Sequence, residues 1–166
     1  MAYTKARELA EGRLTTDPAN TQWQRDLSVS HIKIGDVLAA QGGGPTAIAA
    51  YRNSLVIAEA LATRDPANTA CQRDVSVSHN KIGDVLVAQG DGPAALTAYR
   101  KCLVIREALA ARDPANSQWQ RDLSVSFEKI GDVLAAQGGG PAALAAYRKS
   151  LAIREALAAR DPANTE

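Results

Sequence analysis

The spacing of the prolines constrains the fold more than any other feature of this sequence. All seven prolines of the 166-residue chain fall on two series with a spacing of 48 residues: Pro18, Pro66, Pro114 and Pro162, and Pro45, Pro93 and Pro141. Segments 17–64, 65–112 and 113–160 align without gaps, and the first and third differ at nine of 48 positions. A repeat of this length is typical of solenoids, in which each unit buries its apolar face against the next. We therefore expect a single domain over residues 1–166, built from three repeats.

The sequence also carries parts of two further repeats. Residues 1–16 match the later half of a unit, with Tyr3 in register, and residues 161–166 match the start of a fourth unit. The first helix should then lack its partner, and the last helix should leave a packing face open. Because these end faces are complementary but not identical, they favour head-to-tail association of copies.

Charge and composition argue against several classes of partner. Nineteen Lys and Arg residues against 18 Asp and Glu give a net charge of +1, so no basic surface for nucleic acid is indicated. No stretch approaches the roughly 20 apolar residues of a membrane span, and residues 1–16 lack the apolar run of an export signal. The two cysteines, Cys71 and Cys102, stand where other copies have Trp and Ser. We expect a cytoplasmic protein that binds proteins or peptides and neither nucleic acid nor membrane.

Each repeat is expected to form two helices of about 20 residues. In the first repeat, a face that recurs at steps of three and four carries Trp23, Leu27, Ser30, His31, Ile34, Val37, Leu38 and Gln41. Glycines 42–44 end this helix, and Pro45 begins the next one. The face of the second helix carries Ala47, Ala50, Tyr51, Ser54, Ile57, Ala58 and Leu61. The pattern predicts an all-α fold of stacked, antiparallel helix pairs.

A glycine inside the first helix of every repeat requires a packing reason. Glycine costs up to about 1 kcal/mol relative to alanine in a helix, yet Gly35 recurs as Gly83 and Gly131. With Ser28 and Ala39 it forms a strip of small residues against which the second helix can pack closely. The sequence predicts that the aromatic ring at Tyr51 and its two equivalents fills this contact, with the hydroxyl group at the rim.

Residues 34–57, IGDVLAAQGGGPTAIAAYRNSLVI, resemble the centre of a tetratricopeptide repeat. The family's order of large, glycine, bulky, glycine, alanine, aromatic and small residues is met by Ile34, Gly35, Leu38, Gly42, Ala47, Tyr51 and Ser54. The family unit has about 34 residues, so this array is elongated, and its long second helix is similar to the repeats of kinesin light chain. The resemblance implies a right-handed α-solenoid, part of a longer bacterial array, whose first helices line a concave groove for a peptide or helix.

The resemblance also implies, by position, which residues line the groove. These are Arg25, Val29, Ile32 and Asp36, then Arg73, Val77, Asn80 and Asp84, and finally Arg121, Val125, Glu128 and Asp132. They predict an arginine row near one rim and an aspartate row deeper in the groove. The aspartates favour a partner that bears Lys or Arg. The copies disagree most at Ile32, Asn80 and Glu128, which indicates either a selective surface or free variation of an exposed position.

The sequence offers no catalytic set and no cofactor site. His31 and His79 share a position that the third repeat fills with Phe127, so packing is the better interpretation than metal binding. Neither cysteine has a paired histidine, and the glycine clusters lack the Lys-Ser or Lys-Thr of a phosphate loop. We therefore expect a non-enzymatic interaction scaffold. The alternative is a structural repeat that assembles with itself through its ends.

Overall fold

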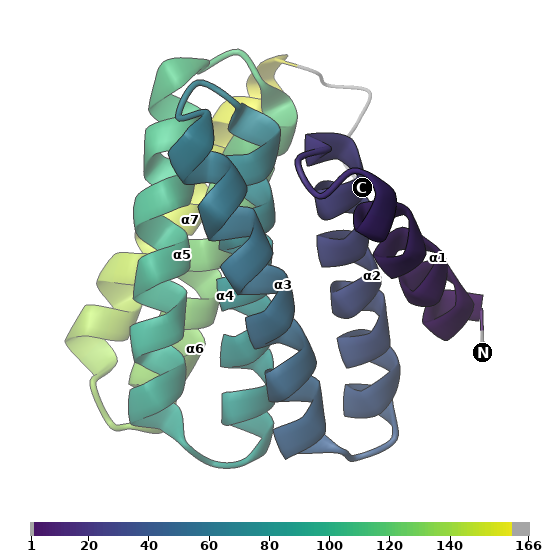
Figure 1. Cartoon of the computed structure of the whole chain (residues 1–166). Helices are drawn as coiled ribbons and strands as arrows, with labels where there is room; N and C mark the ends of the chain where they lie inside the picture. The colour runs from purple at the N-terminus through teal and green to yellow at the C-terminus, as the bar shows by residue number, and fades with distance from the viewer. Residues whose placement is uncertain (1, 161–166) are drawn as a thin grey trace.

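The described part of the chain is entirely helical outside its turns (Figure 1). The structure, a computed structural model, describes residues 2–160, of which residues 2–4, 6, 7 and 10 are described by their backbone alone. The helices are α1 (Ala2–Thr16), α2 (Thr21–Ala40), α3 (Gly44–Arg64), α4 (Thr69–Ala88), α5 (Gly92–Arg112), α6 (Ser117–Ala136) and α7 (Gly140–Arg160). The proposed start of a fourth copy at residues 161–166 and the side chain of Tyr3 lie outside the described residues.

Three antiparallel helix pairs stack on one another. The pairs are α2 with α3, α4 with α5, and α6 with α7; α3 also packs on α4 and α5 on α6, while α1 packs on α2. Each inner helix is thereby covered by its own partner and by a helix of the neighbouring repeat. The predicted all-α solenoid of stacked helix pairs is confirmed.

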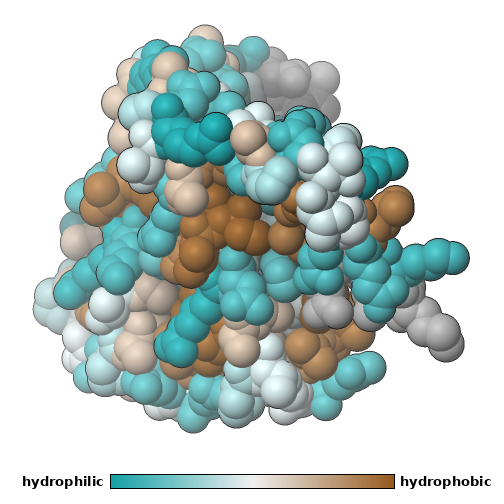
Figure 2. All heavy atoms as spheres, in the orientation of Figure 1, coloured by the Kyte–Doolittle hydropathy of each residue, from teal (hydrophilic) through white to brown (hydrophobic). Residues whose placement is uncertain are grey.

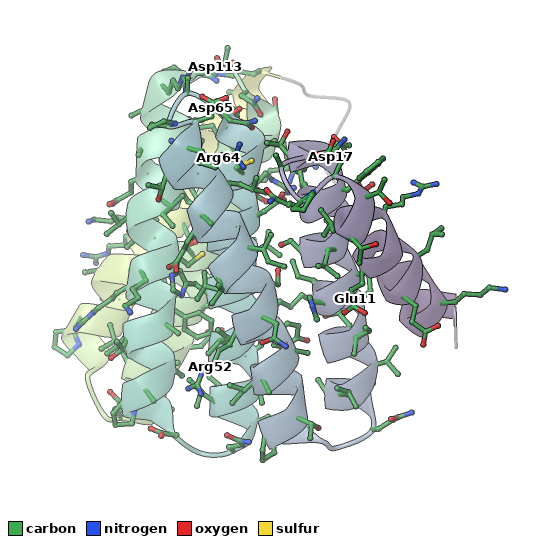
Figure 3. The ribbon with its side chains drawn as sticks, in the orientation of Figure 1. Glu11, Asp17, Arg52, Arg64, Asp65 and Asp113 are labelled. Carbon is green, nitrogen blue, oxygen red and sulfur yellow. The ribbon has the colours of Figure 1, made fainter. Side chains whose placement is uncertain are left out.

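The turns repeat as regularly as the helices. The first helix of each pair begins behind an asparagine, Asn20, Asn68 or Asn116, whose side chain accepts hydrogen bonds from backbone N–H groups of the first turn. It ends before a glycine with a φ of 78°, at Gly42, Gly90 and Gly138. Figure 3 shows Asp17, Asp65 and Asp113, which precede the caps, at the same end of the stack.

The glycine inside each first helix contacts the tyrosine of its own second helix, as predicted. A Cβ atom at Gly35 would lie 2.7 Å from Cδ1 of Tyr51, and one at Gly83 would lie equally close to Cδ1 of Tyr99. Both rings are buried. The third pair repeats this contact, so the close approach of the two helices is a property of every repeat.

The predicted stripe on the first helix is buried best in the middle of the stack. In α4 six of its eight positions are buried, namely Cys71, Val75, Ser78, His79, Ile82 and Val85, whereas Leu86 is half-buried and Gln89 exposed. In α2 the same positions are more open, because only the shorter helix α1 covers them. Val37 is 45% exposed, whereas its equivalent Val85 is 6% exposed. The stripe therefore packs against the preceding repeat and the glycine strip against its own second helix.

Hydroxyl groups join the repeats inside the core. The Ser28 and Ser54 hydroxyls lie 2.8 Å apart across the first pair, and Ser54 lies 3.2 Å from Ser78 of the next pair. All three side chains are fully buried, and the hydrogen bonds satisfy them there. Apolar atoms also reach the surface, and they gather toward the middle of the face seen in Figure 2, with polar atoms around them.

Candidate binding groove

Two hollows lie one repeat apart on the side of the stack where the first helices end. The first, of about 480 Å³, is lined by Asp36, Ala39, Gly42, Gly44, Pro45, Tyr51, Lys81, Asp84, Val85, Ala88 and Gln89. The second, of about 570 Å³, is lined by Asp84, Val87, Gly90, Gly92, Pro93, Tyr99, Lys129, Asp132, Val133, Ala136 and Gln137. Asp84 lines both, so the two hollows adjoin. We call them together the groove.

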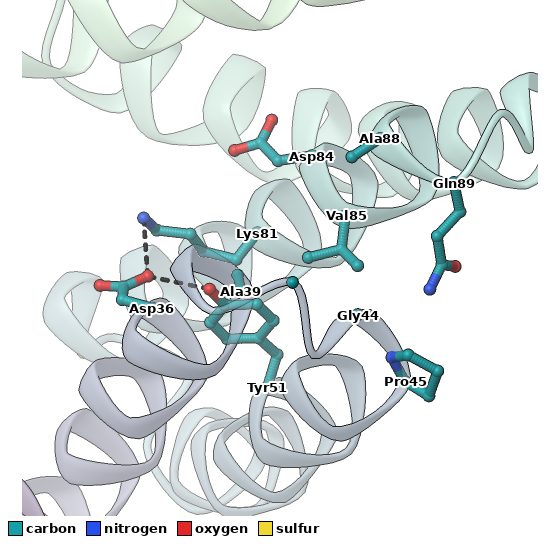
Figure 4. Close-up of a pocket in the computed structure, with 11 residues that line it drawn as sticks. Asp36, Ala39, Gly44, Pro45, Tyr51, Lys81, Asp84, Val85, Ala88 and Gln89 are labelled. Carbon is teal, nitrogen blue, oxygen red and sulfur yellow. Dashed lines mark hydrogen bonds and ion pairs between the residues drawn. The ribbon is translucent and has the colours of Figure 1, made fainter.

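Each hollow contains a tyrosine, an aspartate and a lysine in the same arrangement (Figure 4). The Tyr51 hydroxyl donates a hydrogen bond to Oδ1 of Asp36 at 2.9 Å, and Nζ of Lys81 lies 2.9 Å from the same oxygen. The lysine comes from the next repeat, so this contact joins two repeats. In the second hollow, Tyr99 and Lys129 contact Asp84 Oδ1 at 2.7 and 2.6 Å.

These contacts fix the protonation of the tyrosines. Burial raises the pKa of Tyr51 and Tyr99 well above the ordinary value, and the hydrogen bonds to Asp36 and Asp84 raise both pKa values further. At Tyr147 the hydrogen bond to Asp132 is the main cause of a raised pKa. The phenols therefore remain hydrogen-bond donors at neutral pH. They hold the aspartates in place, and the aspartates supply the negative charge along the groove.

The predicted arginine row does not line the groove. Nε of Arg25 lies 2.7 Å from Asp74 Oδ2, and Nε of Arg73 lies 2.9 Å from Asp122 Oδ2. Each arginine thus pairs with an aspartate of the next repeat, and the hydrogen bond to Asp74 raises the pKa of Arg25. Arg121 has no such aspartate among the described residues. Arg25 and Arg73 therefore join successive repeats.

Of the predicted valines, only Val29 is exposed, while Val77 packs against the core between the first two repeats and Val125 is half-buried. The prediction that Ile32 faces the groove is wrong. Its side chain is 7% exposed and belongs to the core, because it lies four residues after Ser28 and three before Gly35 and so shares their strip. The equivalents Asn80 and Glu128 are half-buried and line neither hollow.

The position held by Ile32, Asn80 and Glu128 in the three repeats has a variable counterpart 26 residues further along the chain. Glu128 forms an ion pair with Arg154 of the second helix of its own repeat. The first repeat has Ile32 and Ala58 at these two places, and both side chains are buried. The variation of this position therefore follows the packing between paired helices rather than the surface of the groove.

The histidines and cysteines are not grouped as a reactive site. Among residues 2–160, no three His, Cys, Asp or Glu side chains are placed to hold one metal ion. His79 is buried, and burial lowers its pKa, with Lys101 as a smaller cause. Cys71 and Cys102 are free and buried, and burial raises the pKa of both thiols. No helix in the described range is sufficiently long and apolar to span a membrane.

The comparisons with known proteins agree with the repeat geometry. A family model described as tetratricopeptide repeat matches residues 78–115, from the middle of α4 to the turn after α5. The chain has a tetratricopeptide-like repeat fold, and its matched segment is similar to this family. No curated protein is similar enough in sequence to match this repeat protein.

Solved structures show the same fold. The crystal structure of BtubC (BKLC) from P. vanneervenii superimposes with a TM-score of 0.68 at 20% identity, over 94% of this tetratricopeptide-like chain. The chain spans 58% of the length of BtubC. MamA matches 94% of the chain and 91% of its own length at 19% identity, but its TM-score of 0.39 supports no argument.

Reasoning from the sequence placed the aspartates of this tetratricopeptide-like groove but missed the lysines beside them. Lys81 and Lys129 stand three residues before Asp84 and Asp132 on the same helices. Their distance to the aspartate of the preceding repeat depends on how far successive helix pairs are rotated. One signal was present in the sequence, since Lys33, Lys81 and Lys129 recur with the same spacing as the aspartates.

Proposed function

We propose that the chain is a non-enzymatic interaction scaffold that binds an extended segment of a partner protein in the groove. The observation that carries the proposal is the recurrence of one hollow, with the same tyrosine, aspartate and lysine, at the 48-residue spacing. Two similar hollows side by side suit a ligand that also repeats, as the side chains of an extended peptide do. The tetratricopeptide-like fold supports this proposal, because such folds generally mediate protein–protein interaction.

The lining favours a segment with basic and small apolar side chains. Pro45, Val85 and the ring of Tyr51 offer apolar surface, while the aspartates offer carboxylate oxygens. Oδ1 of Asp36 receives both the tyrosine and the lysine, whereas Oδ2 accepts no hydrogen bond from the described residues. A Lys or Arg of the partner can therefore bind the second oxygen of Asp36 without breaking the contact between repeats, whereas Oδ2 of Asp84 already accepts a hydrogen bond from Asn80.

Two exposed alanines provide the test. Ala88 lines the first hollow, and Ala40 occupies the equivalent position one repeat earlier, where it lines neither hollow. A library of random displayed peptides is selected on the unaltered chain, and the enriched peptides are then measured on Ala88→Lys and on Ala40→Lys. We expect enrichment of Lys or Arg beside apolar residues and a loss of binding with Ala88→Lys alone. Equal binding to both variants would contradict the groove.

We place this scaffold in the cytoplasm, since its two cysteines are free and buried. A second candidate function is self-assembly through the two ends of the stack. It is favoured by exposed apolar side chains on α7, whose equivalents are buried or half-buried in the inner repeats. This candidate does not depend on the groove, and the next subsection develops it.

A further inference from the structure

The inner junctions between repeats are built from one recurring set of apolar side chains. At the first junction, Ile48 and Leu55 of α3 pack with Ile82 and Val85 of α4 in one cluster. At the second, the equivalent residues of α5 and α6 meet in the same way; they are Leu96, Leu103, Ile130 and Val133. A helix of the α3 type and a helix of the α4 type are therefore complementary surfaces.

Both halves of this contact are also present, uncovered, at the two ends of the stack. On α7, Leu144 and Leu151 are 49% and 55% exposed, although their counterparts at the inner junctions are buried or half-buried. On α2, the half-buried Ile34 and the exposed Val37 correspond to Ile82 and Val85. Helix α7 thus exposes an apolar surface of the α3 type at one end of the stack. Helix α2 exposes an apolar surface of the α4 type at the other end.

Charges match at the same two ends. Inner junctions carry two ion pairs each, one of the Arg25–Asp74 type and one of the Lys81–Asp36 type. At the α7 end, Arg121 and Asp132 are exposed and have no partner from a following repeat among the described residues. At the α2 end, the exposed residues at the complementary positions are Asp26 and Lys33. Stacking these ends in the inner register would create both ion pairs.

Helix α1 covers the α2 end incompletely. It has 15 residues, whereas α3 has 21, and no residue of α1 corresponds to Gly44, which lies against Val85 at the inner junction. Leu9 of α1 is exposed, and Arg13 is exposed as well, with its guanidinium over the Trp23 ring at 5.9 Å. Helix α1 therefore leaves Val37 of α2 exposed.

We propose that a second copy of this chain docks head-to-tail, with its α7 on α2 of the first copy in place of α1. The docked helix covers Val37 with Leu144 and places Arg121 against Asp26 and Asp132 against Lys33. The contact is heterologous, so each copy retains one free end and further copies add to the stack. This proposal rests on the second candidate function and is independent of ligand binding in the groove.

The test measures mass by light scattering across a hundredfold dilution. The unaltered chain is expected to form dimers and longer stacks that dissociate on dilution. Leu144→Asp should remain monomeric throughout, whereas Val56→Asp, on an outer surface that is 67% exposed, should associate like the unaltered chain. A strict monomer at every concentration, or equal loss of association in both variants, would overturn the proposal.

A charge exchange tests the register of docking. Arg121→Asp and Asp26→Arg should each shift dissociation to roughly tenfold higher concentration, and the chain that carries both should recover the original value. Failure of the double variant to recover would overturn this register. Leu144 lines neither hollow, so Leu144→Asp should still bind the selected peptides. Loss of self-association and loss of groove binding are thereby distinguished.

Discussion

Glu128 and Arg154 form an ion pair across the last helix pair, at the two positions where the first repeat buries Ile32 and Ala58. The two positions change together, from an apolar pair to a charged pair. The middle repeat holds Asn80 and Arg106 there, a polar combination that is only partly satisfied. Asn80 Oδ1 and Arg106 Nε are buried without a hydrogen-bond partner in the described structure.

Replacing Asn80 and Arg106 of the middle repeat by apolar residues should therefore raise the stability of the chain. Arg106 is 6% exposed, and among the described residues its guanidinium donates only to the Asp122 carbonyl and the Ser126 hydroxyl. Asn80→Ile with Arg106→Ala introduces the pair of the first repeat and removes a buried charge that lacks a carboxylate. We expect the free energy of unfolding in urea to rise by about 1 to 3 kcal/mol.

The third repeat provides the control for this exchange. Glu128→Ile with Arg154→Ala removes an ion pair whose side chains are about half exposed, so stability should change by less than about 1 kcal/mol. A middle-repeat variant that is no more stable than the unaltered chain would show that Arg106 finds a partner in solution.

The close contact between Gly83 and Tyr99 predicts a strong effect of a single methyl group. A Cβ atom at Gly83 would lie 2.7 Å from Cδ1 of the buried Tyr99 ring, so the ring or the helix must move. Gly83→Ala should lower the free energy of unfolding by about 1 to 3 kcal/mol. Gly12→Ala is the matched control, since nothing lies within 4 Å of its Cβ position and helix propensity should add up to about 1 kcal/mol. Equal effects at the two sites would be inconsistent with this packing.

Arg25 and Arg121 occupy equivalent positions but should differ in their contribution to stability. Among the described residues, Arg25 is the one partner of the buried Asp74 carboxylate, whereas Arg121 has no inter-repeat partner in the described part of the chain. Arg25→Ala should cost about 1 to 2 kcal/mol in chemical unfolding, less than for a fully buried pair, because Arg25 is 37% exposed. Arg121→Ala, measured at a concentration where the chain is monomeric, should be close to neutral. If both substitutions were neutral, the ion pair would contribute nothing to the junction.

His79 should make stability depend on pH. Burial lowers its pKa below the ordinary value of about 6.5, and Lys101 lowers it further. The unfolded chain therefore binds a proton at higher pH than the folded chain does. The contribution of neutral His79 to the free energy of unfolding is fully present above about pH 6.5. It is lost as the pH falls toward the pKa of His79 in the folded chain. His79→Phe introduces the residue type of the third repeat and should make the unfolding midpoint depend less on pH between pH 7 and 5. An unchanged pH dependence of the midpoint would contradict a lowered pKa of His79 in the folded chain.

The repeat made most of the fold predictable. The 48-residue spacing fixed the helix pairs, and Gly35 with Tyr51 was predictable because a helical glycine and a large ring recur together in every copy. Ile32 was misplaced because helical periodicity defines a face without saying how wide the buried face is. Ala58, the equivalent of the Arg154 that pairs with Glu128, is also buried and lies 26 residues away on another helix.

The groove was predictable only in part. The aspartate row follows from the register of the first helices. The pairing of Arg25 with Asp74, and of Lys81 with Asp36, depends on the rotation between successive repeats, which no single repeat encodes. Ile32 and Ala58 of the first repeat are replaced together, by Glu128 and Arg154 in the third repeat. This joint change was visible in the sequence and would have identified the position of Ile32 as a packed one.

The most direct test of the account is the affinity of one selected basic peptide for two aspartate variants, measured by calorimetry. Asp84→Asn removes one negative charge shared by both hollows but keeps an oxygen that accepts the Tyr99 hydrogen bond. Asp91→Asn removes one charge at a helix cap outside both hollows, and asparagine caps equally well. We predict a dissociation constant raised about tenfold by Asp84→Asn and unchanged by Asp91→Asn. Equal affinities for the two variants would contradict the groove as the binding surface.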